Sequence, residues 1–158
     1  MDTNTKKFMK EAIRLATENL KLKNGGPFGA IVVKDGKIIG KGMNTVTSTN
    51  DPTAHAEINA IREACNNLGS FQLDGCEIYS SCEPCPMCLG AIYWARPSKL
   101  YFAAGREDAS GAGFDDSFIY EELKLPVEKR KIPTEQILKE EAAGVFKKWI
   151  DLDSKVEY

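Results

Sequence analysis

The chain has little histidine and no long hydrophobic run. Its 158 residues include one histidine, His55, so any metal site must draw its other ligands from different side chains. The longest apolar run, Cys88–Ala95, is far shorter than a membrane span, and the first residues lack the apolar core of a signal peptide. These absences argue against a membrane protein and a secreted protein, and we expect a cytoplasmic one.

The chain also lacks an excess of either charge. Its 21 lysines and arginines against 23 aspartates and glutamates leave a formal net charge of −2, and the sequence pI is about 5.6. Nucleic-acid-binding domains usually carry a positive excess, so we expect no nucleic-acid partner. Internal repeats and low-complexity segments are absent too, and the length suits a single domain, residues 1–158, with a sizeable core.

The five cysteines do not form the pattern of a disulfide framework. Their number is odd, and three of them, Cys82, Cys85 and Cys88, recur at intervals of three. Where a turn enters a helix, that spacing can direct thiolates to one metal ion. Cys65 and Cys76 fall on apolar faces, where we expect them to be buried as small hydrophobic residues. The cysteine pattern therefore favours a metal site in a reducing compartment.

Hydrophobic periodicity predicts helices alternating with strands. We expect helices at residues 5–23, 54–68, 87–95, 116–123 and 140–150, and strands at residues 28–33, 37–43, 76–80, 99–104 and 134–138. Asp35-Gly36 should join the first two strands as a tight hairpin, residues 44–51 should be polar loop, and residues 105–113 loop or a short helical turn. This alternation favours a largely parallel sheet that is covered on both faces.

Two short motifs at expected helix starts carry the chemistry. They are His55-Ala56-Glu57 and Pro84-Cys85-Pro86-Met87-Cys88. His-x-Glu followed by Pro-Cys-x-x-Cys is the signature of zinc-dependent nucleobase deaminases. His55, Cys85 and Cys88 would hold zinc, which keeps a fourth position for a water and lowers the pKa of that water to about 7. Glu57 would carry a proton from this water to a ring nitrogen, and then to the departing amine.

Plainer interpretations compete with this one. If Cys82 were a fourth ligand, a closed Cys₃His zinc would staple an interaction module and would not need Glu57; we expect Cys82 near the metal but not on it. Glu57 alone would be a solvated acid stabilised by the helix dipole. By default, the other candidate residues would be core aromatics (Phe28, Trp94), a polar strand end (Asn44), a helix N-cap (Asp116) and a disordered terminus (Tyr158).

The chain resembles the cytidine deaminase-like superfamily over nearly its whole length, and within it the bacterial guanine deaminases. Beyond the zinc motifs, the resemblance rests on residues 25–30, 50–57, 90–97 and 113–120 and on the terminal Glu157-Tyr158. The zinc motifs belong to the whole superfamily and do not identify the base. Phe114-Asp115-Asp116-Ser117-Phe118 and the terminal tyrosine are the more specific marks.

This resemblance implies an α/β fold, a three-layer α/β/α sandwich around a five-stranded mixed sheet. It also implies a homodimer in which the tail, about residues 151–158, crosses to the partner, so that Tyr158 closes the partner's active site. Asn44 and Asp116 would hydrogen-bond the purine, with Asp116 also moving a proton at the leaving amine. Phe28 and Trp94 would pack against the purine ring. The implied reaction converts guanine and water to xanthine and ammonia through attack at C2.

Two other deaminations would use the same zinc site, that of adenosine in tRNA and that of the nucleoside guanosine. The acidic pI and the Phe-Asp-Asp segment count against the tRNA substrate. The resemblance leaves the choice between guanine and guanosine open.

Overall fold

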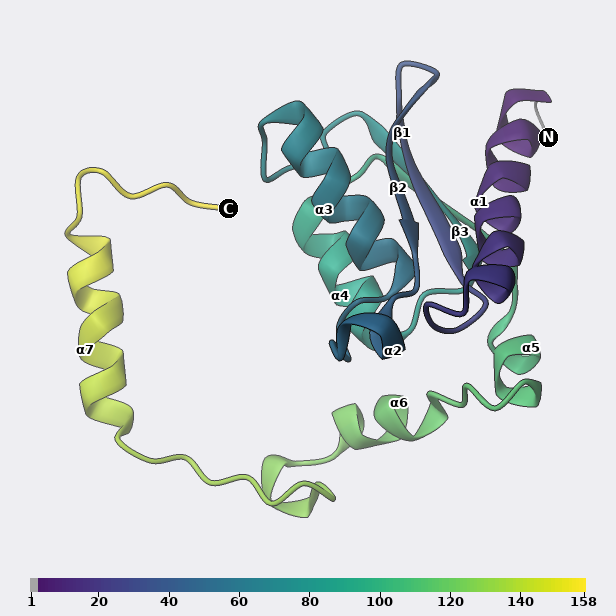
Figure 1. The fold of residues 1–158 in the computed structure, drawn as a ribbon. Coiled ribbons are helices and arrows are strands. Elements are labelled where there is room, and N and C mark those ends of the chain that lie inside the picture. Colours follow the sequence, from purple (N-terminus) through teal and green to yellow (C-terminus); the bar gives the residue numbers. More distant parts are fainter. Residues whose placement is uncertain (1–2) are drawn as a thin grey trace. The chain divides into compact units, whose positions relative to one another are not determined.

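The computed structural model describes residues 3–158, which form two compact units. The first unit ends at Asp116, and the second spans Ser117–Tyr158. The first unit contains the β-sheet and both zinc motifs, and the second is built from helices and connecting segments (Figure 1). Among residues 3–158, no helix combines the length and the apolar character that crossing a bilayer requires.

The elements follow the expected alternation closely. The described part of the first unit runs α1 (Thr3–Leu22), β1 (Gly29–Lys34), β2 (Lys37–Met43), α2 (Val46–Thr49), α3 (Ala56–Leu68), β3 (Cys76–Cys82), α4 (Pro86–Ala95), β4 (Lys99–Ala104) and α5 (Arg106–Gly111). The second unit runs α6 (Ser117–Lys124), the 3₁₀ turn η1 (Val127–Lys129) and α7 (Lys139–Ile150). Helix α2 lies where we expected polar loop, and α5 lies where we allowed a short helical turn.

The sheet is mixed, so the expectation of a largely parallel sheet from periodicity is wrong. Its strand order is β2-β1-β3-β4, with β1 antiparallel to both β2 and β3, and with β3 parallel to β4. The helical crossover from β2 to β3 does make those two strands run the same way. However, β1 lies between them, and its hairpin with β2 turns two of the three pairings antiparallel.

The expected five-stranded sheet is also wrong, because the sheet of the described residues has four strands. Residues 134–138, expected as the fifth strand, pair with no strand in the described chain. Ile137 and Leu138 are exposed, and Leu138 has a left-handed φ of +51° as the N-cap of α7. A left-handed residue interrupts an extended segment, and the Leu138 carbonyl accepts from the Ala142 N–H in the first turn of α7 rather than from a neighbouring strand.

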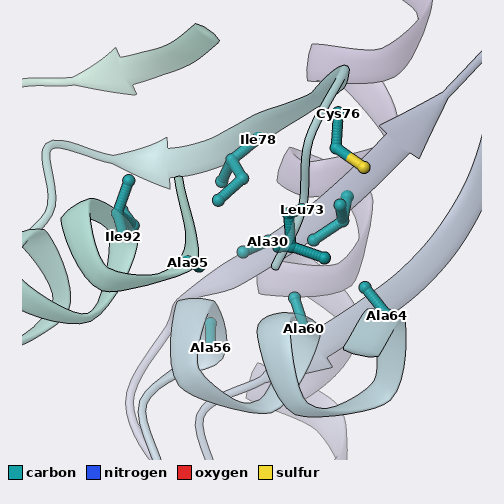
Figure 2. Packing of buried hydrophobic residues seen from close by; sticks show 10 residues of the cluster. Ala30, Ala56, Ala60, Ala64, Leu73, Cys76, Ile78, Ile92 and Ala95 are labelled. Atoms are coloured by element: carbon teal, nitrogen blue, oxygen red, sulfur yellow. The ribbon is translucent and has the colours of Figure 1, made fainter. Parts of the chain in front are cut away.

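Helices cover both faces of the sheet, which gives the first unit three layers (Figure 1). Alternation along β1 separates two cores, because Ile31 and Val33 face α1 while Ala30 and Val32 face α3. The α1 core also contains Phe8, Ala12, Leu15 and Tyr79. On the other face, Ala56, Ala60 and Ala64 of α3 pack toward Ala30 and Ile78 (Figure 2).

Small residues let α3 lie unusually close to β2. Gly40 and Gly42 face the helix, and a Cβ built on Gly42 would come within 2.0 Å of the Ala56 carbonyl oxygen. No side chain larger than hydrogen fits there without moving the helix. The position of the first turn of α3, which carries His55 and Glu57, is therefore set by this close packing.

Candidate active site

His55 and Glu57 are placed by the start of α3. His55 is the N-cap with an extended backbone, and Glu57 lies in the first turn, where it is 6% exposed. The Asn59 side chain secures this turn by donating from Nδ2 to the Met43 carbonyl at 2.9 Å. Helix α3 thus carries its histidine at the edge of the core and its carboxylate inside it.

Cys85 and Cys88 are placed by the start of α4. Cys85 is the N-cap, Pro86 is the first helical residue, and Cys88 is fully buried one turn from the cap. Proline suits the first helical position because its fixed φ matches the helix and the missing N–H is not needed there. The preceding turn is held by the Glu83 backbone N–H, which donates to the Ala104 carbonyl at 2.9 Å.

The side chains of His55, Cys85 and Cys88 converge. The Nδ1 atom of His55 lies 3.6 Å from the Cys85 sulfur and 3.4 Å from the Cys88 sulfur, and the three donor atoms all lie within 4.8 Å of one another. Ordinary zinc–sulfur and zinc–nitrogen bond lengths at a tetrahedral angle place such atoms about 3.6 Å apart. The donor set and its spacing therefore fit one zinc ion.

Cys82 lies outside this group. Its buried thiol donates to the Gly105 carbonyl at 3.7 Å, and burial raises its pKa. The described residues thus assemble three metal ligands and not the closed Cys₃His set of a structural site. Three protein ligands are the arrangement of catalytic zinc, which keeps a coordination position for water or substrate.

The electrostatics of the site favour a thiolate beside the histidine. The contact with Cys88 lowers the pKa of Cys85 to about 4, and the same contact together with burial raises the pKa of Cys88. The contact with Cys85 raises the pKa of His55. The two thiols behave as a coupled pair in which one thiolate forms early, and a metal must displace the remaining proton.

Glu57 is held by two neighbours. Ser80 Oγ donates to Glu57 Oε1 at 3.2 Å, and the Cys88 thiol donates to Oε2 at 3.5 Å. Burial raises the pKa of Glu57. Sequence reasoning did not single out Ser80, which is buried in β3. The available signal was a hydroxyl residue in the apolar strand that leads into the cysteine turn.

Asn44 and Phe28 lie close together in the folded structure. Asn44 is buried, and its Oδ1 accepts from the backbone N–H groups of Gly26 and Val46, each at 3.2 Å. Because both partners are donors, the orientation of the amide is fixed and Nδ2 points away from them. The ring of Phe28 meets Phe114 edge to face at 5.0 Å, a contact that sequence reasoning missed.

The structure places the three remaining candidates in different settings. Asp116 ends the first unit, where one carboxylate oxygen lies 3.5 Å from Nε of Arg106. Trp94 of α4 is 63% exposed, so the default interpretation as a core aromatic is wrong for it. Tyr158 ends the second unit and is 68% exposed. The geometry joins the zinc ligands and Glu57 directly, whereas the roles of these three residues stay predictions.

The similarity to known proteins extends along nearly the whole chain. Residues 2–104 match the family described as the cytidine and deoxycytidylate deaminase zinc-binding region. The guanine deaminase of Bacillus subtilis is 56% identical over 155 residues, covering 98% of this chain and 99% of that protein. An X-ray structure of guanine deaminase from Bacillus subtilis superposes with a TM-score of 0.94 at 55% identity, covering 100% of this chain and 99% of that one.

The tRNA-specific adenosine deaminase of Aquifex aeolicus is 47% identical over a shorter stretch of 97 residues. That stretch covers 61% of this chain and 64% of the relative. The family match, the full-length similarity and the convergent His/Cys/Cys group agree with one another. The chain therefore belongs to the zinc-binding cytidine and deoxycytidylate deaminase family, with a guanine deaminase among its full-length relatives.

Proposed function

We propose that the protein is a zinc-dependent hydrolytic deaminase that converts guanine to xanthine and ammonia. The substrate assignment rests on how much of the chain is similar to each kind of relative. The similarity covers 98% of the chain for the Bacillus subtilis guanine deaminase and 61% for the tRNA-specific enzyme of Aquifex aeolicus. The family match ends at residue 104, so Asp116 and Tyr158 lie where full-length similarity to a guanine deaminase is the informative comparison.

His55, Cys85 and Cys88 would hold the zinc, which when bound activates a water for attack on the ring carbon. Glu57 would move the protons of the reaction, from that water to a ring nitrogen and then to the departing amine. Its burial favours the protonated form, so the carboxylate can hold the proton between these two transfers. The hydrogen bond from Ser80 keeps one carboxylate oxygen oriented while the other exchanges the proton.

Purine recognition would fall to Asp116, Asn44 and Phe28. A carboxylate can accept from the exocyclic amine and the ring N–H of guanine together, and adenine lacks this donor pair. The backbone contacts of Asn44 leave Nδ2 to donate to a purine acceptor. Phe28, held edge-on by Phe114, would offer its ring to the base. A selective pocket needs such partners, because burying a purine edge unpaired is costly.

We also propose a cytoplasmic homodimer whose subunits exchange their C-terminal tails. Large apolar side chains are exposed in both units, including Tyr93 and Trp94 in α4 and Phe146 in α7, and a second copy could bury them. In this arrangement Trp94 would line the purine site of its own subunit, and Tyr158 of one subunit would close the site of the other. Thiolate ligands for zinc require reduced cysteines, which supports the cytoplasm.

The proposal is tested by ammonia release from zinc-loaded protein offered guanine, guanosine, adenine, cytosine, cytidine and a tRNA anticodon stem-loop. We expect release from guanine and from none of the others. Release from guanosine or from the RNA alone would keep the zinc chemistry and overturn the substrate. Release from none of these compounds would contradict the enzyme itself and favour a structural zinc.

Glu57→Gln tests the proton carrier in the same assay. We expect this variant to keep about one zinc per subunit and to lose turnover, because the amide cannot exchange the proton. Glu63→Gln is the matched control, since Glu63 lies on the same helix but its carboxylate accepts from the backbone of Lys41 at the exposed edge. Turnover that survives Glu57→Gln would show that another group moves the protons.

A further inference from the structure

We propose that Arg106 is a positioning residue that holds the Asp116 carboxylate toward the purine. The inference deepens the proposed function and rests on it, since Asp116 acquires its role only if a purine base is the substrate. Nε of Arg106 lies 3.5 Å from Oδ1 of Asp116. The Arg106 side chain is 37% exposed and that of Asp116 is 20% exposed, so the ion pair is partly shielded from water.

The backbone directly before Arg106 is hydrogen-bonded to the turn that carries the cysteine ligands. It follows Gly105, whose carbonyl oxygen accepts from the Cys82 thiol at 3.7 Å. One residue earlier, the Ala104 carbonyl accepts from the Glu83 backbone N–H at 2.9 Å. These contacts join the start of α5 to the residues directly before Cys85. The guanidinium therefore originates from a backbone that is fixed relative to the metal ligands.

Phe114 holds the segment that carries Asp116, and Arg106 contacts the Asp116 carboxylate itself. Two residues before Asp116, the ring of Phe114 packs edge to face on Phe28, with centroids 5.0 Å apart at 84°. The Phe114 backbone N–H also donates to the Ala109 carbonyl at the end of α5, at 2.9 Å. Phe114 thus fixes where the segment passes the purine site, and the Arg106 ion pair fixes how the Asp116 carboxylate is turned.

The ion pair suits the task that Asp116 would perform. A carboxylate must present its oxygens in one plane to accept two parallel N–H donors from a guanine edge. Nε of Arg106 lies beside Oδ1 in this ion pair, and the carboxylate would present its other edge to the base. A guanidinium is planar and rigid, so the ion pair favours one orientation of the carboxylate. Without it, the carboxylate would rotate and meet the base in the wrong plane.

A double-mutant cycle on the zinc-loaded protein tests this inference. The variants are Arg106→Gln, Arg106→Lys, Asp116→Asn and Arg106→Gln with Asp116→Asn, assayed for kcat and KM on guanine. We expect Arg106→Gln to lower kcat/KM by about 10- to 100-fold, as small misplacements of a reacting group do. KM should rise and kcat should fall. Arg106→Lys should recover part of the loss, and adding Arg106→Gln to Asp116→Asn should cost nothing further.

Arg62→Gln is the matched control, because Arg62 forms a comparable ion pair with Asp51 at 3.8 Å. This variant should leave both kcat and KM unchanged. Loss of folded protein would lower kcat without raising KM. Additive effects of the two substitutions, or an unchanged kcat/KM in Arg106→Gln, would overturn the inference. An inactive wild-type protein would instead count against the proposed function. In that case a crystal structure of Arg106→Gln decides, since an Asp116 carboxylate that keeps its orientation overturns the positioning role.

Discussion

A carboxylate that carries protons must exchange with two different atoms in one reaction, so its orientation matters as much as its pKa. In this protein the two oxygens of Glu57 have different partners, a hydroxyl from Ser80 and a thiol from Cys88. If Cys88 gives up its proton to bind zinc, the contact with Oε2 changes while the contact with Oε1 stays. The hydrogen bond from Ser80 would then be the constant support of Glu57, the proposed proton carrier.

Removing the Ser80 hydroxyl should therefore weaken catalysis and leave the metal in place. We expect Ser80→Ala to lower kcat by about 2- to 10-fold, the loss of one ordinary hydrogen bond, with KM and zinc content unchanged. Steady-state kinetics on guanine with metal analysis measures this. Ser98→Ala is the control, because it removes a donor to the Cys76 carbonyl away from the zinc ligands. An unchanged kcat in Ser80→Ala would mean that Glu57 does not need this support.

The residues of the zinc motif could be found from the sequence, because their spacing is characteristic. The residues that hold the site in place could not. His55, Cys85 and Cys88 follow a spacing that zinc itself dictates, and the structure brings these three together. Ser80 and Phe114 contact residues far from them in the chain, Glu57 of α3 and Phe28 respectively. No spacing rule encodes those contacts, because they depend on how the elements pack.

At the scale of elements, the close approach of α3 to β2 sets the position of His55, the zinc ligand at the start of α3. Gly42→Ala would place a methyl group against the Ala56 carbonyl and push the first turn of α3 away. We expect this variant to lose zinc affinity by about 10-fold or more, because ligands must be held near their metal geometry. Competition with a chelator of known affinity measures the loss. Gly144→Ala, in open space on α7, is the control and should bind zinc normally. Normal affinity in Gly42→Ala would contradict this account.

A second link between elements joins α1 to β2 and depends on pH. Glu11 contacts Arg14 at 2.8 Å and Lys41 at 2.8 Å, and these contacts lower its pKa from 4.5 to about 2. A carboxyl group with a lowered folded-state pKa stabilises the protein above pH 4.5, and this stabilisation is lost as the pH falls toward 2. Glu11→Gln should therefore reduce the free energy of unfolding by about 1 kcal/mol or less at pH 7.

Urea unfolding of the wild type and Glu11→Gln at pH 7 and pH 3 checks this dependence. Both proteins are measured free of zinc, because acid releases zinc from thiolates. The difference between them should be smaller at pH 3. Glu18→Gln, which removes a contact made within α1 alone, is the control. A difference that grows on acidification would show that the charge of Glu11 does not stabilise the fold.

The elements themselves were largely predictable, and their arrangement was not. Helix and strand periods are local, so the bounds of α3, α4 and β4 follow from apolar spacing. The position of β1 between β2 and β3 depends on long-range strand pairing, and it makes the sheet mixed. Residues 134–138 have a strand-like pattern, but a strand exists only where a neighbour pairs with it.

At the scale of the whole molecule, the question is whether one subunit can work alone. The first unit contains the zinc ligands, Glu57 and Asp116, whereas Tyr158 belongs to the second unit. If tails are exchanged, each active site is built from two chains. Dimerisation and catalysis would then be linked, and activity per subunit should fall on dilution below the dimer dissociation constant.

Complementation between two damaged chains separates exchange from a tail that acts on its own subunit. One chain carries Glu57→Gln with an intact tail, and the other has an intact Glu57 but lacks Glu157 and Tyr158. Each should be inactive alone. When they are co-expressed, half of randomly assorted dimers are mixed, and in each of these one site has both Glu57 and a partner's Tyr158. We therefore expect about a quarter of wild-type activity. No recovery despite mixed dimers in native mass spectrometry would mean that the tail serves its own subunit, and full activity of the truncated chain alone would mean that Tyr158 closes neither site.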